Sequence, residues 1–436
     1  MINRILSLKI LIILSASINK NKFINELERD IPYLKNLYLD IHQNPEISLM
    51  EKVTAQKLAN ELKKVGYNVT ENFGGYGIVG ILKNGDGPTI LYRTDLDALP
   101  MEEKTGLPYA SKVKTRNFDG NEVGTMHSCG HDMHMAVWAG TARALAKRKN
   151  EWSGTVMMIG QPAEEIGAGA AMMLNEGLYE KFPIPDYGIG LHSSPTIPSG
   201  KVGFGKGYTM ANTESIDIKI YGQGAHGASP HMSIDPIVTA SLIVMELQTI
   251  VSRNINPIDD AVITVGSIKG GTKHNIIPDE VNLQLTIRTY KDEVRKLIHK
   301  RIKEICNGIA SSMGLDKSRW PEVVIPDNYT PANYNDEKLV DIMFDVSESV
   351  LGKENVINSE PQMVGEDFAR YGSTKEDIPT VLYWLGTVPK ERMEKYNEGN
   401  YALPALHSPF YYPDIENSIK TGVLVSTESM IKLFNK

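Results

Sequence analysis

The first part of the chain shows the three- to four-residue spacing of apolar side chains that is typical of helices. The spacing predicts one helix over 23–43, closed by Asn44-Pro45. It predicts a second helix that contains Leu58 and Leu62 and ends at Gly66. Both helices are expected to pack on a core.

Short apolar runs separated by polar turns come next and predict strands. The runs on either side of Asn84-Gly85, at 78–82 and 89–92, predict a β-hairpin with Asn-Gly at its tip. The segment Gly75–Gly80 matches G-x-G-x-x-G, but no helix pattern follows it, so we reject a dinucleotide site. Further strands are predicted at 154–159 and 187–191.

The pattern changes at about residue 214, where Ile216, Ile218 and Ile220 alternate with polar residues as in a half-exposed antiparallel strand. The order strand, helix, strand, strand, helix that follows is typical of a small α+β unit. We therefore expect one α/β domain with a mixed sheet, formed by 23–212 and 318–436, and an inserted α+β domain over 213–317.

The N-terminus resembles a secretory signal peptide. Arg4 and Lys9 are basic, Ile10–Leu14 are apolar, and Ser15-Ala16-Ser17 offer small residues for cleavage. Residues 1–22 are therefore expected to be removed and the protein to be secreted or periplasmic, or otherwise cytoplasmic. No apolar run is long enough to span a bilayer.

Composition narrows the range of partners. The chain has 436 residues, a net charge of −7 and no basic run, which argues against a nucleic-acid partner. Its two cysteines, Cys129 and Cys306, do not form a disulfide framework. We expect Cys306 to be a buried packing residue on a helix.

The densest candidate chemistry lies in the stretch 126–134, which holds one thiol, three imidazoles and a carboxylate. Thiolate and imidazole are ligands that zinc and similar metals prefer. The alternative is structural, because Cys packs as a small hydrophobe and His forms hydrogen bonds. His42, which lies before Pro45, is expected to be structural.

Polar groups also follow three of the predicted strands. Asp95 and Asp97 follow one strand, Glu164-Glu165 the next and His192 a third. Because neighbours in an extended segment point in opposite directions, one of the two glutamates can bind metal while the other acts on water. For an isolated D-x-D pair, a solvated acidic turn is the alternative.

Eight segments, in this order, resemble the aminoacylase/carboxypeptidase family of dinuclear metallohydrolases. The resemblance is to its amidohydrolase branch, which includes hippurate hydrolases, indole-acetyl-amino-acid hydrolases and N-acetyl-diaminopimelate deacetylases. The segments are 93–100, 126–134, 161–165, 191–192, 222–230, 275–279, 366–368 and 406–409.

The resemblance implies two divalent metal ions, zinc or manganese, and hydrolysis of the amide bond of N-acyl amino acids or small peptides. It implies Glu164 as general base, Asp97 as the residue that orients a ligand, namely His131, and His226 as oxyanion donor. The implied ligands are Cys129, which bridges the two ions, His131, Glu165, His192 and His407.

Substrate and partner groups are also implied. Asn275 and Arg288 are candidates for binding the substrate carboxylate, since a guanidinium matches a carboxylate. A strand-surface salt bridge is the alternative for Arg288. The insert is expected to act as a lid or to pair two copies as a homodimer. Asp132 and His134 are expected to be supporting residues, and the role of Asp95 is left open.

Two other functions compete with hydrolysis. A metal-dependent binding or scaffold homologue that has lost catalysis would be free to lose Glu164, which is present here. A redox enzyme that uses Cys129 with Cys306 lacks the C-x-x-C pair that such chemistry favours.

Overall fold

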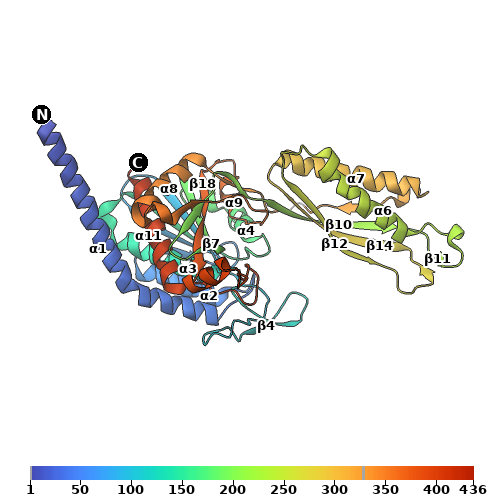
Figure 1. Ribbon diagram of the computed structural model, residues 1–436, viewed down its shortest axis with the longest axis horizontal. Helices are drawn as coiled ribbons and strands as arrows, with labels where there is room; N and C mark the ends of the chain where they lie inside the picture. The colour runs from blue at the N-terminus through green and yellow to red at the C-terminus, as the bar shows by residue number, and fades with distance from the viewer. Residues whose placement is uncertain (1, 327–328) are drawn as a thin grey trace. The chain divides into compact units, whose positions relative to one another are not determined.

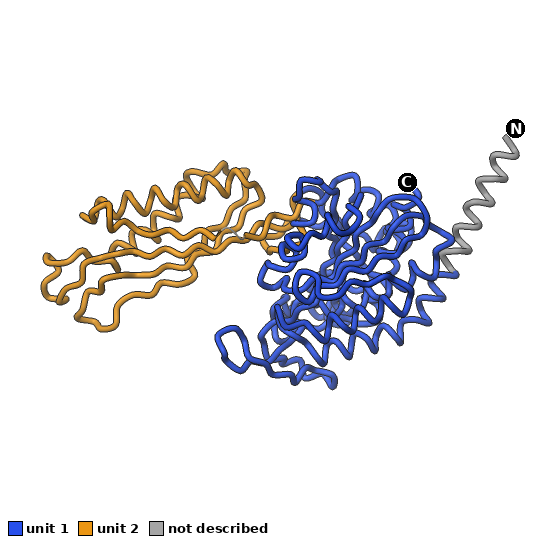
Figure 2. Tube along the Cα trace, turned by 180° about the vertical axis from the view of Figure 1, so that it is seen from behind, with its two compact units in different colours: residues 1–207, 335–360, 370–436 blue, residues 208–334, 361–369 orange. Residues whose placement is uncertain are grey.

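The computed structural model describes residues 2–326 and 329–436, with side chains from residue 22 onward (Figure 1). The chain divides into two compact units (Figure 2). The first consists of residues 1–207, 335–360 and 370–436, and the second of residues 208–334 and 361–369. The predicted insert, 213–317, lies inside the second unit.

The first unit is built on one eight-stranded mixed sheet in the order β1-β2-β6-β3-β7-β18-β8-β17. Its inner strands β6, β3, β7 and β18 run parallel to one another. The strands are β1 (Asn68–Glu71), β2 (Ile78–Asn84), β3 (Thr89–Asp95), β6 (Gly154–Gln161), β7 (Tyr187–Pro198), β8 (Val202–Phe204), β17 (Val356–Asn358) and β18 (Thr380–Val388).

The predicted hairpin around Asn84-Gly85 is wrong. Strands β2 and β3 are not paired, because β6 lies between them and pairs with both. All residues of β3 are buried, as expected for an inner strand with both faces covered. Asn84 donates to the carbonyls of Lys149 and Trp152, so this turn is fixed to the segment that leads into β6.

Helices pack together and against this sheet. Helices α1, α3 and α11 contact one another, and Figure 1 shows them side by side. Helix α3 begins at His131, inside the donor-rich stretch 126–134. The helices are α1 (Ile2–Gln43), α2 (Lys52–Lys64), α3 (His131–Lys147), α4 (Gly169–Asn175), α5 (Leu178–Lys181), α8 (Glu337–Leu351), α9 (Ala369–Gly372), α10 (Lys390–Asn397) and α11 (Ile415–Phe434).

The second unit has the predicted order of elements. A four-stranded antiparallel sheet, β12-β14-β10-β15, carries two helices, and Cys306 is buried on one of them as expected. A small ribbon joins β11 (Ala225–His226) to β13 (Ile276–Ile277). The other elements are β10 (Asn212–Tyr221), α6 (Pro236–Thr249), β12 (Ala261–Gly270), β14 (Glu280–Thr289), α7 (Asp292–Ser312) and β15 (Glu322–Val324).

Short elements complete the chain, among them the antiparallel pair β4 (Lys114–Arg116) and β5 (Glu122–Gly124). Strands β9 (Gly207–Met210) and β16 (Asn333–Asn335) lie where the chain passes between the units. The predicted signal peptide covers 1–22, and the side chains of 1–21 are outside the described residues. Within the described part of the chain, no helix is both long enough and apolar enough to cross a membrane.

Candidate metal centre

The candidate ligands gather at the carboxyl ends of the inner parallel strands, where α/β folds place ligands. Asp95 ends β3, and Glu164 follows the end of β6. Cys129 and His131 stand at the start of α3, on either side of Gly130. Gly130 has φ +85, a left-handed conformation that suits glycine and turns the chain sharply into the helix.

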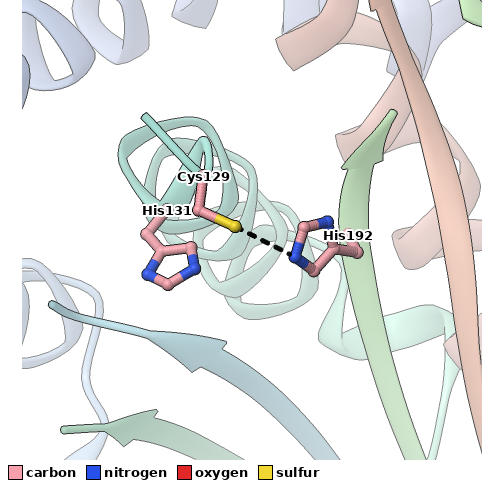
Figure 3. A group of neighbouring side chains, drawn as sticks. All are labelled: Cys129, His131 and His192. Atoms are coloured by element: carbon pink, nitrogen blue, oxygen red, sulfur yellow. Dashed lines mark hydrogen bonds between the residues drawn. The ribbon is translucent and has the colours of Figure 1, made fainter. Parts of the chain in front are cut away.

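Cys129, His131 and His192 form one group that could hold a metal ion (Figure 3). Figure 3 shows the Cys129 thiol directed at the His192 ring, and Cys129 Sγ lies 3.6 Å from His192 Nε2. All three side chains are buried. His192 lies inside β7, opposite Trp384, and not at a strand end as the sequence suggested, because β7 continues to Pro198.

Cys129 also belongs to a second group, with Glu165 and His407. His407 Nε2 lies 3.3 Å from Cys129 Sγ and 3.3 Å from Glu165 Oε2. The His407 N–H donates to the Ser128 carbonyl at 3.0 Å, so the loop that carries it is tied to the residue before Cys129. Two ligand groups that share one sulfur are the arrangement that a bridging thiolate requires.

The hydrogen bonds of the imidazoles test whether this donor set fits a metal. His131 Nδ1–H donates to the Asp97 carbonyl at 2.7 Å, and His192 Nδ1–H donates to the Ser193 carbonyl at 3.0 Å. Both rings therefore leave Nε2 as a lone pair toward the cluster, as metal-binding histidines commonly do. Among the described residues, His131 Nε2 has no hydrogen-bond partner although it is buried.

Carboxylates surround that nitrogen. His131 Nε2 lies 3.5 Å from Asp95 and 3.8 Å from both Glu164 and Glu165. Burial, and then the nearby charge of Glu165, raise the pKa of the Cys129 thiol well above its usual range. A bound cation reverses this preference because it favours the thiolate. The buried nitrogen, sulfur and oxygen donors therefore fit a pair of divalent ions.

Asp97 is placed to orient His131. Its carbonyl accepts the His131 Nδ1–H, and its carboxylate lies 3.5 Å from the same nitrogen. Burial would raise the pKa of Asp97, but the hydrogen bond from His131 outweighs it and the pKa is lowered. Ser48 Oγ and the Glu165 N–H donate to the other Asp97 oxygen, at 2.6 and 3.0 Å.

His134, by contrast, has both ring nitrogens in use. Its Nδ1–H donates to Asp95 at 2.7 Å, and its Nε2 accepts the Ser193 N–H at 2.8 Å. No lone pair remains for a metal, so His134 supports the residue after His192 and does not act as a ligand. Arg93, whose role the sequence did not reveal, pairs with Asp95 at 2.8 Å.

A buried charged group lies beside the centre. His42 Nδ1–H donates to Asp132 at 2.6 Å, and its Nε2 lies 3.2 Å from Glu103. Burial would lower the pKa of His42, but the hydrogen bonds to Asp132 and Glu103 raise it to about 9. His42 therefore joins α1 to the start of α3 as an imidazolium, which agrees with the expected structural role.

The candidate substrate groups belong to the second unit. His226 and Asn275 lie side by side, since the Gly227 N–H donates to the Asn275 carbonyl at 2.8 Å. His226 is exposed, and its Nδ1 accepts the Ala228 N–H at 3.0 Å, which leaves an outward Nε2–H donor.

Arg288 is not brought together with these two residues. It lies near the far end of β14, roughly 25 Å along the strand from the ribbon that carries His226. Burial lowers the pKa of Arg288, and no carboxylate partner accompanies it among the described residues. The alternative of a surface salt bridge therefore has no support.

The chain resembles known proteins over most of its length. Residues 91–407 match the model of peptidase family M20/M25/M40. The chain is 38% identical to N-acetyl-L-cysteine deacetylase of Bacillus subtilis (strain 168) over 349 residues, 80% of this chain and 78% of that protein. It is also 38% identical to hippurate hydrolase of Campylobacter jejuni over 338 residues, 77% of this chain and 84% of that protein.

A solved structure supports the same assignment. A Bacillus subtilis protein described as a dinuclear metal-binding peptidase of family M20 aligns with a TM-score of 0.76 and 30% identity. The alignment covers 94% of this chain and 99% of that chain.

Fold, donor set and relatives together define a metal-dependent hydrolase. The chain belongs to peptidase family M20/M25/M40, so the resemblance inferred from eight sequence segments is confirmed. Its relatives are named as deacetylases, a hippurate hydrolase and carboxypeptidases, and the expected amidohydrolase activity agrees with them. The scaffold alternative has no support in these comparisons.

Proposed function

We propose that this enzyme hydrolyses the amide bond of small N-acyl amino acids. The observation that carries the proposal is the cluster in which two ligand groups share Cys129. Relatives named for N-acetylcysteine, hippurate and N-acetyldiaminopimelate indicate the class of substrate. Two bound divalent ions, zinc or manganese, would lower the pKa of water and polarise the substrate carbonyl.

In this proposal Cys129, which is common to both groups, would help to hold the ions, together with His131 and His192, whose Nε2 atoms face the cluster. Glu165 and His407 complete the second group. Asp97 keeps the His131 ring in the orientation that directs Nε2 inward, and His134 holds the backbone after His192.

Glu164 is the proposed general base. Its carboxylate is buried and lies 3.8 Å from His131 Nε2. Glu164 is therefore next to the proposed ligands but belongs to neither of the two groups that contain Cys129. It would take a proton from the attacking water and deliver it to the leaving amine. Its neighbour Glu165 belongs to the other group, with Cys129 and His407; the two glutamates lie in a turn and not in the extended segment that the sequence predicted.

The second unit would supply substrate contacts. His226 has an exposed Nε2–H that suits an oxyanion donor, and Arg288 has an uncompensated guanidinium that suits a carboxylate. Because these groups lie roughly 25 Å apart on one copy, a substrate of amino-acid size cannot touch both. We propose that the two groups come from two copies of the chain, with Asn275 beside His226.

A homodimer through the second unit would meet that requirement. Strand β12 is at an edge of its sheet, and edge strands pair readily with other chains. Exposed apolar side chains accompany it on α6, including Leu242 and Met245, which is 71% exposed. Sedimentation of wild type and Met245→Lys tests this: wild type should be dimeric and the variant monomeric, and a monomeric wild type refutes the pairing.

Activity is tested by a hydrolysis screen. Metal-free protein receives zinc or manganese and is offered hippurate, N-acetylcysteine and N-acetyldiaminopimelate, with release of free amine as the readout. Hydrolysis that depends on added metal is expected for at least one compound. Protein that binds metal and hydrolyses none of them contradicts the proposal.

A further inference from the structure

The turn that carries Glu164 is built around a strained residue. Ala163 has φ +52, a left-handed conformation that disfavours residues with a side chain. Its N–H donates to Glu51 Oε1 at 2.8 Å, and its carbonyl accepts the N–H groups of Ala168 and Gly169 at 3.1 and 3.2 Å. The direction in which Glu164 leaves the turn depends on these bonds.

Glu51 does not serve the helix that it precedes. It occupies the N-cap position of α2, but its side chain makes no capping hydrogen bond. Glu46 accepts the N–H groups of Val53 and Thr54 instead, at 3.2 and 2.8 Å. Glu51 is fully buried, and a buried carboxylate is costly unless it is hydrogen-bonded. Since Glu51 does not cap the helix, its hydrogen bond with Ala163 must have another role.

A second strained residue uses the same oxygen. Leu49 has φ +65, and its N–H donates to Glu51 Oε1 at 2.8 Å. Such conformations are unfavourable for residues with a side chain and persist only where the surroundings hold them. Glu51 Oε1 therefore accepts hydrogen bonds from two residues in the left-handed conformation: Leu49, in the loop before α2, and Ala163, in the turn that carries Glu164.

The same short loop also reaches the other side of Glu164. Ser48 Oγ donates to Asp97, and the same carboxylate oxygen accepts the Glu165 N–H. Residues 48–51 thus hold both neighbours of Glu164, although they lie far from it in sequence.

We propose that Glu51 is a positioning residue for Glu164: by accepting the Ala163 N–H, it holds the turn that directs the Glu164 carboxylate at the metal centre. The inference rests on the proposed role of Glu164 as general base. Burial, and then the negative charge of Asp97, raise the pKa of Glu51 to about 7. The hydrogen bonds that Glu51 accepts from backbone N–H groups offset part of this rise in its pKa.

The test compares Glu51→Ala with Glu46→Ala, a matched control that loses a carboxylate from the same helix start without touching the turn. Displacing a reacting group by about 1 Å costs about 100-fold in rate. We expect Glu51→Ala to lower kcat about 10- to 100-fold, with KM and bound metal unchanged. Glu46→Ala should lower only the melting temperature. If Glu51→Ala cannot be purified, Glu51→Met replaces it.

Two further readouts separate positioning from stability. In metal-free protein, amide hydrogen exchange over 163–169 should accelerate in Glu51→Ala and not in Glu46→Ala. Glu51→Gln, which keeps an acceptor oxygen, should retain slow exchange and most of kcat. Adding Ala163→Gly to Glu51→Ala should restore part of kcat, because glycine adopts a positive φ without strain, whereas adding Leu49→Gly should not.

Equal losses of kcat in Glu51→Ala and Glu46→Ala, with unchanged exchange over 163–169, overturn the proposal. Glu164→Gln is measured in parallel. If Glu164→Gln is inactive while Glu51→Ala behaves like the control, only the positioning role fails. If Glu164→Gln keeps wild-type kcat, the proposed base is wrong whatever Glu51 does.

Discussion

The metal centre and the substrate groups of the second unit differ in how much their own surroundings fix them. Around the metal centre, His131 and His192 are buried and each has its Nδ1 directed by a backbone carbonyl. In the second unit, His226 and Asn275 are exposed; His226 lies in a two-stranded ribbon and Asn275 directly precedes its other strand. The proposed metal ligands are thus held in place by the fold itself, whereas the proposed substrate groups have no comparable support from buried neighbours.

This difference predicts which substitutions act on chemistry, on metal binding or on stability alone. A change inside the metal centre should alter metal content or the chemical step. A change in the second unit should leave the metals in place.

The largest effect is expected for Glu164→Gln, which removes the proton acceptor and preserves shape. General acid–base catalysis contributes about 10²- to 10⁴-fold, so kcat should fall by that factor with metal content and melting temperature unchanged. Steady-state kinetics with elemental analysis checks this. A variant within a few-fold of wild type rules out Glu164 as the base.

His226→Ala should act on turnover and not on the metals. Removing one oxyanion donor costs about 10²- to 10³-fold, and kcat and kcat/KM should fall together. His231→Ala, which removes another exposed imidazole from the same unit, is the matched control and should leave kcat and kcat/KM unchanged. A His226→Ala protein with a lower melting temperature and normal kcat would make the residue purely structural.

Gly130→Ala should weaken metal binding. A Cβ at Gly130 would lie 2.8 Å from Ser193 Oγ, and φ is +85, so Cys129 and His131 on either side must shift. We expect metal affinity to fall about 10- to 100-fold, as for other changes that disturb ligand orientation. Gly66→Ala is the control, since Gly66 has φ +90 but open space around it. Equal metal affinity in both variants contradicts the prediction.

The smallest effect on activity is expected for His42→Gln, which should act on stability alone. Because the folded-state pKa of His42 is raised from 6.5 to about 9, its stabilisation is complete below pH 6.5 and is lost as the pH rises to 9. The loss is on the order of 3 kcal/mol in the free energy of unfolding. Urea unfolding of wild type and His42→Gln at pH 6 and pH 9 measures this loss. If the difference in the free energy of unfolding between the two proteins is the same at both pH values, this account is excluded.

Much of the fold followed from local patterns, because helix spacing and strand alternation are set by neighbours in sequence. The stretch 126–134 identified the metal centre because several donors are close along the chain. The errors came from distant segments. Asn-Gly favoured a hairpin, but β6 lies between β2 and β3 and pairs with both. The residues near the turn do not indicate that a strand from elsewhere in the chain will be inserted there.

The supporting residues of the site were harder to predict for the same reason. Glu51 appears in sequence as an ordinary residue before a helix, yet its hydrogen-bond partner Ala163 lies 112 positions away. Arg93 and His134 likewise act through Asp95 and Ser193, contacts that only the assembled sheet creates.

The central claim is that the cluster around Cys129 holds two metal ions. The most direct measurement is a titration of metal-free protein with zinc or manganese, followed by removal of free metal and elemental analysis of bound metal per chain. The account predicts two ions for wild type and a loss at both sites for Cys129→Ala, because Cys129 belongs to both ligand groups. Wild type that stays at one ion or none, or Cys129→Ala that binds two ions as tightly as wild type, would contradict it.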